Sequence, residues 1–119
     1  MEQRTTAAAL TKSARYKALK RDMLDSLEAR GLIGRQYTER VEEYMSLWCW
    51  LQMLNEDIAL QGVSVEYVHG KDQRGTTDNK SLGIATRVLA QMNSLWKALG
   101  FQEQAQNSKM AQGGVDDDL

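Results

Sequence analysis

Two long apolar stretches with helical periodicity, Glu39–Gln61 and Ser81–Leu99, dominate this sequence, and no proline interrupts them. With Trp48 at zero on a helical wheel, one broad face of the first stretch is apolar. That face holds Val41, Tyr44, Met45, Leu51, Leu54, Ile58 and Ala59. The second stretch has a single apolar face, made of Leu82, Ala85, Val88, Leu89, Met92, Leu95, Trp96 and Leu99. We expect an antiparallel helical hairpin in an all-α fold, with Trp48 and Trp96 along its seam.

The first stretch carries more apolar surface than one partner helix can cover. Four residues fall outside its main face: Cys49, Trp50, Met53 and Leu60. A chain of 119 residues has little else with which to bury them, so we expect other copies to do so. Trp and Met are favoured at interface cores, which makes Trp50 and Met53 the centre of this candidate interface. Burial beneath the chain's own first helix is the alternative.

The segment between the two stretches, residues 62–80, changes period. Gly62 is expected to end the first long helix, and Val63–Val68 alternates like a short strand. His69–Gly75 reads as a turn, and Thr76–Thr77 as a weak return strand. Because an isolated β-hairpin is marginal in water, it is expected to pack on the helices or to join a neighbouring copy.

The front of the chain is basic. Residues 1–40 hold nine Lys/Arg against five Asp/Glu, while the rest of the chain holds six against eleven. This asymmetry suggests that the front meets a polyanion such as DNA. Residues 1–10 look frayed, a helix is expected from Thr11 or Ser13 to Gly31, and Thr38 is the expected N-cap of the first long helix.

The expected first helix is basic in its first half and acidic in its second. This order is the reverse of what the helix dipole favours, so local stability does not explain it. Exposed cations on a helix can contact phosphates with little sequence preference. The candidate DNA-binding residues are Lys12, Arg15, Lys17, Lys20 and Arg21. A solvated charged face remains the alternative.

We find no pattern typical of an enzyme. His69 is the single histidine, and it has no second ligand at metal-site spacing. The adjacent acidic pairs Glu42/Glu43 and Glu56/Asp57 do not face each other on a helix, and are expected to form a solvated or intersubunit edge. No catalytic residue, metal site or cofactor is therefore predicted.

The single cysteine, Cys49, suits a reducing compartment and a packing role. The first residues show no apolar segment typical of a signal peptide. No apolar run approaches the ~20 residues that span a bilayer. We therefore expect an intracellular, soluble protein that does not enter a membrane.

Several of these features occur together in a known family. The helix with Tyr44, Trp48, Leu51, Ile58 and Gly62, the glycine-containing insert, and the closing block Gln91–Phe101 resemble the small terminase subunits of tailed bacteriophages and prophages. The resemblance covers about Thr11–Gln104. Relatives often have proline after the asparagine before the last helix, and a segment with Pro and Arg after the final Leu-Gly. This chain has Asn79-Lys80 and Phe101–Gln104 there.

The resemblance implies a helical protomer that assembles into a homo-oligomeric ring through its central helices. It also implies recognition of double-stranded viral DNA at the packaging site, and transfer of that DNA to the large terminase subunit, which carries the ATPase and the nuclease. The compartment would be the host bacterial cytoplasm.

Three regions are therefore expected. Residues 1–37 form a basic DNA-binding arm, residues 38–104 form the oligomerising helical hairpin with its β-hairpin insert, and residues 105–119 form a disordered acidic tail. Two other functions remain open: a structural head–tail adaptor, and a small dimeric DNA-binding regulator.

Overall fold

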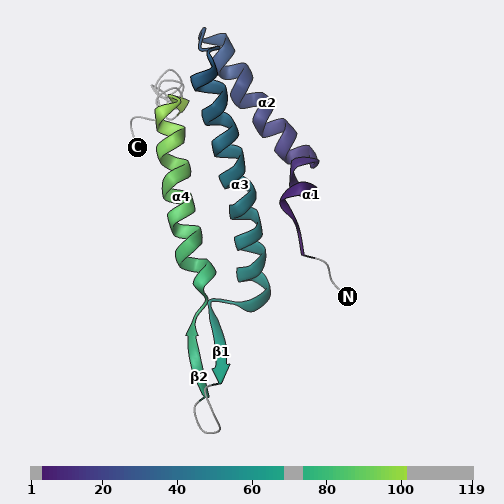
Figure 1. Ribbon diagram of the computed structural model, residues 1–119, viewed down its shortest axis with the longest axis vertical. Helices are drawn as coiled ribbons and strands as arrows, with labels where there is room; N and C mark the ends of the chain where they lie inside the picture. Colours follow the sequence, from purple (N-terminus) through teal and green to yellow (C-terminus); the bar gives the residue numbers. More distant parts are fainter. Residues whose placement is uncertain (1–3, 69–73, 102–119) are drawn as a thin grey trace, which may run out of the picture.

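The computed structural model describes residues 4–68 and 74–101. Its elements in chain order are helices α1 (Ala7–Thr11), α2 (Ala14–Ala29) and α3 (Arg35–Gln61), strands β1 (Ser64–Val68) and β2 (Arg74–Asp78), and helix α4 (Lys80–Ala98). Helices α3 and α4 form an antiparallel hairpin, α2 lies along the other side of α3, and the two strands extend beyond the hairpin's end (Figure 1). The predicted helical fold with a small two-stranded insert is confirmed.

The N-terminal segment is more ordered than predicted. Residues 7–10, expected to be frayed, form α1 together with Thr11, and the helix begins because the Thr6 side chain accepts a hydrogen bond from the Ala9 backbone N–H. Helix α2 begins at the predicted cap, where Ser13 Oγ accepts from the Tyr16 N–H at 3.2 Å. It ends in a Schellman motif around Gly31, whose φ of 77° suits glycine.

Helix α3 begins earlier than predicted, at Arg35, with Gly34 as its N-cap. Thr38 therefore lies inside the helix, where its hydroxyl donates to the Arg35 carbonyl oxygen at 3.2 Å. The extra turn brings Tyr37 against the core, and this packing favours helix over the local capping signal of Thr38. Gly62 ends the helix with a φ of 84°, as predicted.

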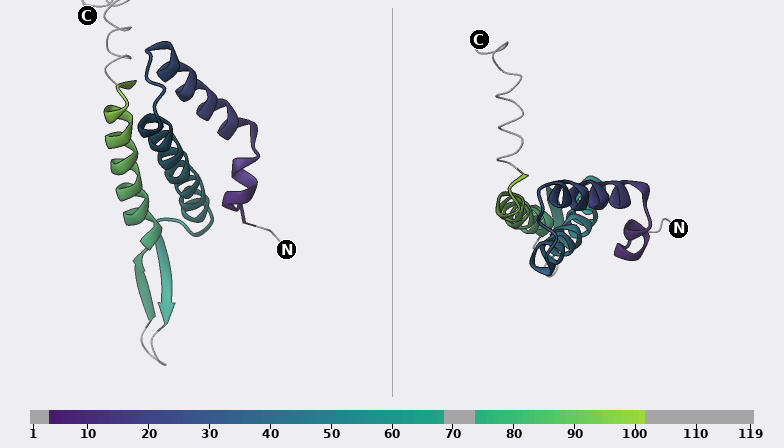
Figure 2. Two further views of the ribbon diagram at one scale, coloured as in Figure 1. Left: turned by 45° about the horizontal axis from the view of Figure 1, so that its top comes forward. Right: turned by 90° about the horizontal axis from the view of Figure 1, so that it is seen from above.

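The insert is the predicted antiparallel hairpin, with a longer second strand. β2 begins at Arg74, inside the expected turn, because pairing continues in one register from Ser64↔Asp78 to Val68↔Arg74. His69 and the turn residues 70–73 lie outside the described part of the chain, as does the acidic tail. The hairpin points away from α3 and α4 instead of folding back onto them (Figure 2).

Asn79 joins the hairpin to α4. Of the two predicted caps, Asn79 is the one used: its Oδ1 accepts from the Ser81 N–H at 3.0 Å, and its Nδ2 donates to the Gly62 carbonyl oxygen at 2.9 Å. The side chain is 5% exposed, so these bonds satisfy a buried polar group. Gly100, with a φ of 81°, follows the helix end as predicted.

The aromatic residues of the core divide between two seams. The Trp96 ring lies 5.5 Å from Tyr44 across the α3–α4 seam and 4.7 Å from Phe101. The Trp48 ring instead meets Tyr16 of α2 edge-on at 5.9 Å. Arg30, just after α2, donates to the Leu99 carbonyl oxygen at 2.6 Å and lies over the Phe101 ring. The end of α2 is thereby tied to the end of α4.

Candidate nucleic-acid interface and apolar groove

The five predicted DNA-binding residues divide into two groups. Lys20 forms an ion pair with Glu42 of α3 at 2.6 Å, and this hydrogen bond raises the pKa of Lys20. The Arg15 guanidinium lies over the Trp48 ring, 5.5 Å from its centroid. These two cations help to attach α2 to α3, so phosphate contact is not required to explain them.

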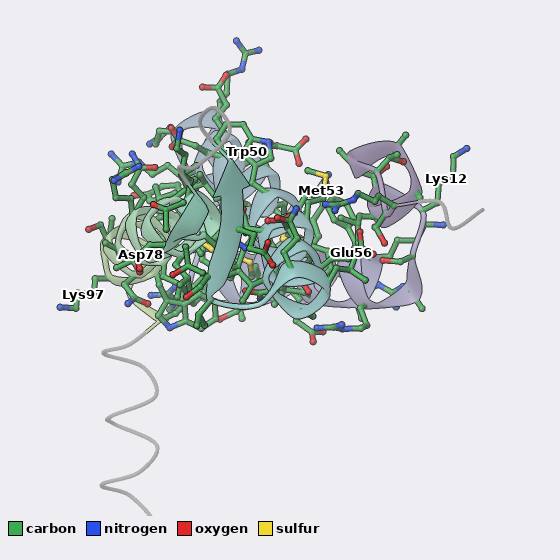
Figure 3. All side chains as sticks on the ribbon, turned by 90° about the horizontal axis from the view of Figure 1, so that it is seen from below. Lys12, Trp50, Met53, Glu56, Asp78 and Lys97 are labelled. Carbon is green, nitrogen blue, oxygen red and sulfur yellow. The ribbon has the colours of Figure 1, made fainter. Side chains whose placement is uncertain are left out.

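The other three cations are free to meet a ligand. Lys12, Lys17 and Arg21 are exposed, and the described part of the chain offers them no ion-pair partner. Lys17 and Arg21 are four residues apart on α2 and therefore share a face. Lys12 precedes the helix and extends away from the protein (Figure 3). The second half of the same helix is acidic, so the free cations of α2 lie in its first half.

An apolar groove runs between α3 and α4, and Trp50 lies at its centre. Trp50 is 50% exposed, so the alternative of burial under the first helix is wrong for this residue. One hollow of about 680 Å³ lies between Trp50 and Leu47 of α3 and Leu95 and Ala98 of α4. A second, of about 380 Å³, is lined by Trp50, Met53, Leu54, Ile84 and Val88. We call these two hollows the Trp50 groove.

The four predicted interface residues are not equivalent. Trp50 and Met53 lie on the same side of α3 (Figure 3), and Leu60 near the end of the helix is also exposed. Cys49, in contrast, is 3% exposed and belongs to the core. The structure corrects the prediction that Cys49 belongs to the interface, because α2 covers a second face of α3. Burial raises the pKa of the Cys49 thiol.

A cluster of hydrogen bonds around Glu56 and Asp57 was missed by sequence reasoning. Both oxygens of Glu56 accept from Thr5, from its N–H at 2.9 Å and its hydroxyl at 2.7 Å. Asp57 accepts from Arg4, Gln61 and Ser81, each at 2.7 Å. The bond from Arg4 first and that from Ser81 next lower the pKa of Asp57 to about 2.

This cluster replaces the predicted solvated or intersubunit edge with contacts inside the protomer. Carboxylates in the last turns of a helix meet the negative end of its dipole and need compensating donors. The position of Glu56 and Asp57 near the end of the predicted helix was therefore the signal in the sequence that such donors are needed. The N-terminal segment supplies the donors from more than fifty positions away. The bonds from Thr5 also lower the pKa of Glu56.

Residues 4–68 and 74–101 contain no group of three His, Cys, Asp or Glu side chains that could hold a metal ion. His69 lies outside these ranges. No helix within them is long and apolar enough to cross a membrane. A scan against protein-family models finds no matching family, and searches of curated proteins and of solved structures find no match either.

Proposed function

We propose that this chain is a small terminase subunit, which recognises viral DNA at the packaging site and delivers it to the large subunit. Exposed cations also occur on α4, but one group of free cations (Lys12, Lys17 and Arg21) is separate from the uncovered apolar groove, and this separation carries the proposal. The cations lie at the α1–α2 end, and the groove lies between α3 and α4. DNA and a neighbouring copy can therefore bind at the same time.

Self-association would use the Trp50 groove. A half-exposed tryptophan beside a methionine is an unusual surface for a monomer, and both residue types are favoured at interface cores. In a closed homo-oligomer, each copy would place one apolar surface against the next copy. Leu60 would extend this contact toward the end of α3.

DNA contact would use Lys12, Lys17 and Arg21. Each cation that neutralises a phosphate releases counterions, so the affinity falls as the salt concentration rises. Three cations per copy give weak, sequence-independent binding, and several copies in one ring strengthen it by avidity. Recruitment of the large subunit, with its ATPase and nuclease, and a place in the host bacterial cytoplasm belong to the same proposal.

The test compares two triple variants. Lys12→Ala/Lys17→Ala/Arg21→Ala removes the proposed phosphate contacts, and Lys80→Ala/Arg87→Ala/Lys97→Ala removes three exposed cations from α4 as a matched control. Gel retardation of duplex DNA across a salt series should show loss of binding in the first variant alone. The slope of log affinity against log salt should flatten by about 0.9 for each phosphate that is no longer neutralised.

Native mass spectrometry of the same samples separates the competing functions. A closed ring of wild-type copies that binds duplex DNA supports the small-subunit proposal. A ring that does not retard free duplex favours a head–tail adaptor, and a mass of two protomers favours a dimeric regulator. If both triple variants bind DNA equally well, the cations of the α1–α2 end do not contact DNA.

A further inference from the structure

The β-hairpin has two unpaired edges, and the geometry identifies which backbone groups lie on them. The Asn79 N–H donates to the Val63 carbonyl oxygen at 2.8 Å, which marks Val63↔Asn79 as a hydrogen-bonded pair. In an antiparallel ladder such pairs alternate with non-bonded ones. With the observed register, Ser64↔Asp78 and Glu66↔Thr76 are therefore non-bonded pairs.

The backbone N–H and C=O groups of a non-bonded pair point outward, away from the partner strand. Thr76 and Asp78 thus present their groups along the β2 edge, and Ser64 and Glu66 present theirs along the β1 edge. These outward groups have no hydrogen-bond partner in the described part of the chain. Each edge is a ready template for another strand.

Charged residues, Arg74 and Asp78, stand at the two ends of β2, but the middle of the strand lacks the devices that usually protect an exposed edge. Natural edges carry proline, lysine, a bulge or an inward-pointing charge. The middle of β2 is Gly75, Thr76 and Thr77, and its register with β1 is uninterrupted by a bulge. A two-stranded sheet that points away from the helices is also marginal by itself.

We propose that the hairpin joins the hairpin of a second copy of this chain, the β2 edge of one copy pairing with the β1 edge of the next. This rests on the proposed ring. In a ring with rotational symmetry all hairpins point the same way, so β2 of one copy runs antiparallel to β1 of its neighbour. Each copy then supplies both edges, and closure of the ring leaves none free.

The base of the hairpin leads directly into α4, whose first turns line one hollow of the Trp50 groove. Val63, directly before β1, is 61% exposed, and Ile84 in the first turns of α4 lines the lower hollow and is 41% exposed. Contact between copies along the groove would therefore bring their hairpins side by side. The apolar contact along the Trp50 groove and the strand pairing between hairpins would then form one interface.

Proline substitution tests each edge separately. Thr76→Pro removes an outward N–H from β2, and Glu66→Pro removes one from β1, while the inward ladder of the hairpin keeps its donors. Thr76→Val and Glu66→Gln keep the backbone N–H and serve as controls. Native mass spectrometry should show that each proline variant loses the ring, whereas both controls retain it.

Mixing the two proline variants gives a sharper result. The intact β2 edge of Glu66→Pro can pair with the intact β1 edge of Thr76→Pro, but no further copy can add. Mixed dimers are therefore expected, without rings. Rings formed by either proline variant alone would overturn the proposal.

Hydrogen exchange on the wild-type ring is an independent readout. A free hairpin protects only its inward amides, so pairing on both edges should give about twice as many slowly exchanging amides in residues 63–68 and 74–79. A wild-type ring that binds DNA but leaves Thr76 and Asp78 unprotected overturns the strand pairing and retains the proposed function. A ring that shows strand pairing but does not bind DNA supports the strand pairing and overturns the proposed function.

Discussion

The Arg4 guanidinium lies 2.7 Å from the Asp57 carboxylate, so the first described residue of the chain is bonded to the last turns of α3. Asp57 also accepts from Ser81 at the start of α4. One carboxylate thus connects the N-terminal segment with both long helices. The contact helps to hold the N-terminal segment against the helical hairpin.

Asp57 should make the stability of the protein sensitive to acid. Its pKa is about 2 in the folded state against 3.8 ordinarily, so its contribution is complete above pH ~4 and is lost as the pH falls toward 2. The melting temperature of the wild type should fall over this window by more than that of Asp57→Asn. At pH 7 the variant should be the less stable protein. Parallel melting curves for the two proteins down to pH 2 would contradict the assignment.

Replacing Asn79 should damage the junction between the hairpin and α4. Asn79→Ala removes an N-cap acceptor and leaves the Gly62 carbonyl oxygen without its donor, at an expected cost of about 1–3 kcal/mol. Asn79→Ser keeps a neutral capping oxygen and loses the Nδ2 donor, so it should fall between the wild type and Asn79→Ala. Urea unfolding measures all three. Equal stabilities would show that the capping bonds contribute nothing.

Two glycines should respond to alanine in opposite directions. Gly31 has a φ of 77° and no atom within 4 Å of an added Cβ, so Gly31→Ala should cost about 1–2 kcal/mol through backbone strain alone. Gly83 lies inside α4, where an added Cβ would make only an ordinary contact with the Arg87 guanidinium at 3.9 Å, so Gly83→Ala should stabilise the protein by about 0.5–1 kcal/mol. Denaturant midpoints give both values. The same sign for both substitutions would refute this difference.

Releasing Lys20 from its ion pair should strengthen DNA binding if α2 contacts phosphates. Glu42→Gln removes the carboxylate that holds Lys20, which becomes a further free cation beside Lys17 and Arg21. The salt dependence of affinity should steepen by about 0.9 for each additional phosphate neutralised. Glu39→Gln, an exposed carboxylate without this ion pair, is the control. A slope unchanged by Glu42→Gln would place Lys20 away from the DNA.

The features that the sequence predicted well are local ones. Gly31, Gly62 and Gly100 all follow helix ends with positive φ, and Ser13 caps α2 as expected. Such signals depend on a few neighbouring residues. The start of α3 was missed because packing of the preceding turn outweighs the capping signal of Thr38.

The candidate site was predictable only in part, because its details depend on distant contacts. A helical wheel identifies the second apolar face of α3 but does not show which residues of that face α2 covers. Cys49 became core while Trp50 stayed exposed. Likewise, charge pattern alone does not separate Arg15, which lies over Trp48, from the exposed Lys17.

The Arg30 bond to Leu99 lies at one end of the N-terminal region, and the contacts of Arg4 and Thr5 lie at the other. The N-terminal region is bonded to the long helices at both of its ends, and these bonds hold α2 against α3. The helix that carries Lys17 and Arg21 is therefore positioned before any ligand arrives. In the proposed ring, these helices would place positive charge at regular intervals, and this spacing would favour a duplex that follows the curvature of the ring.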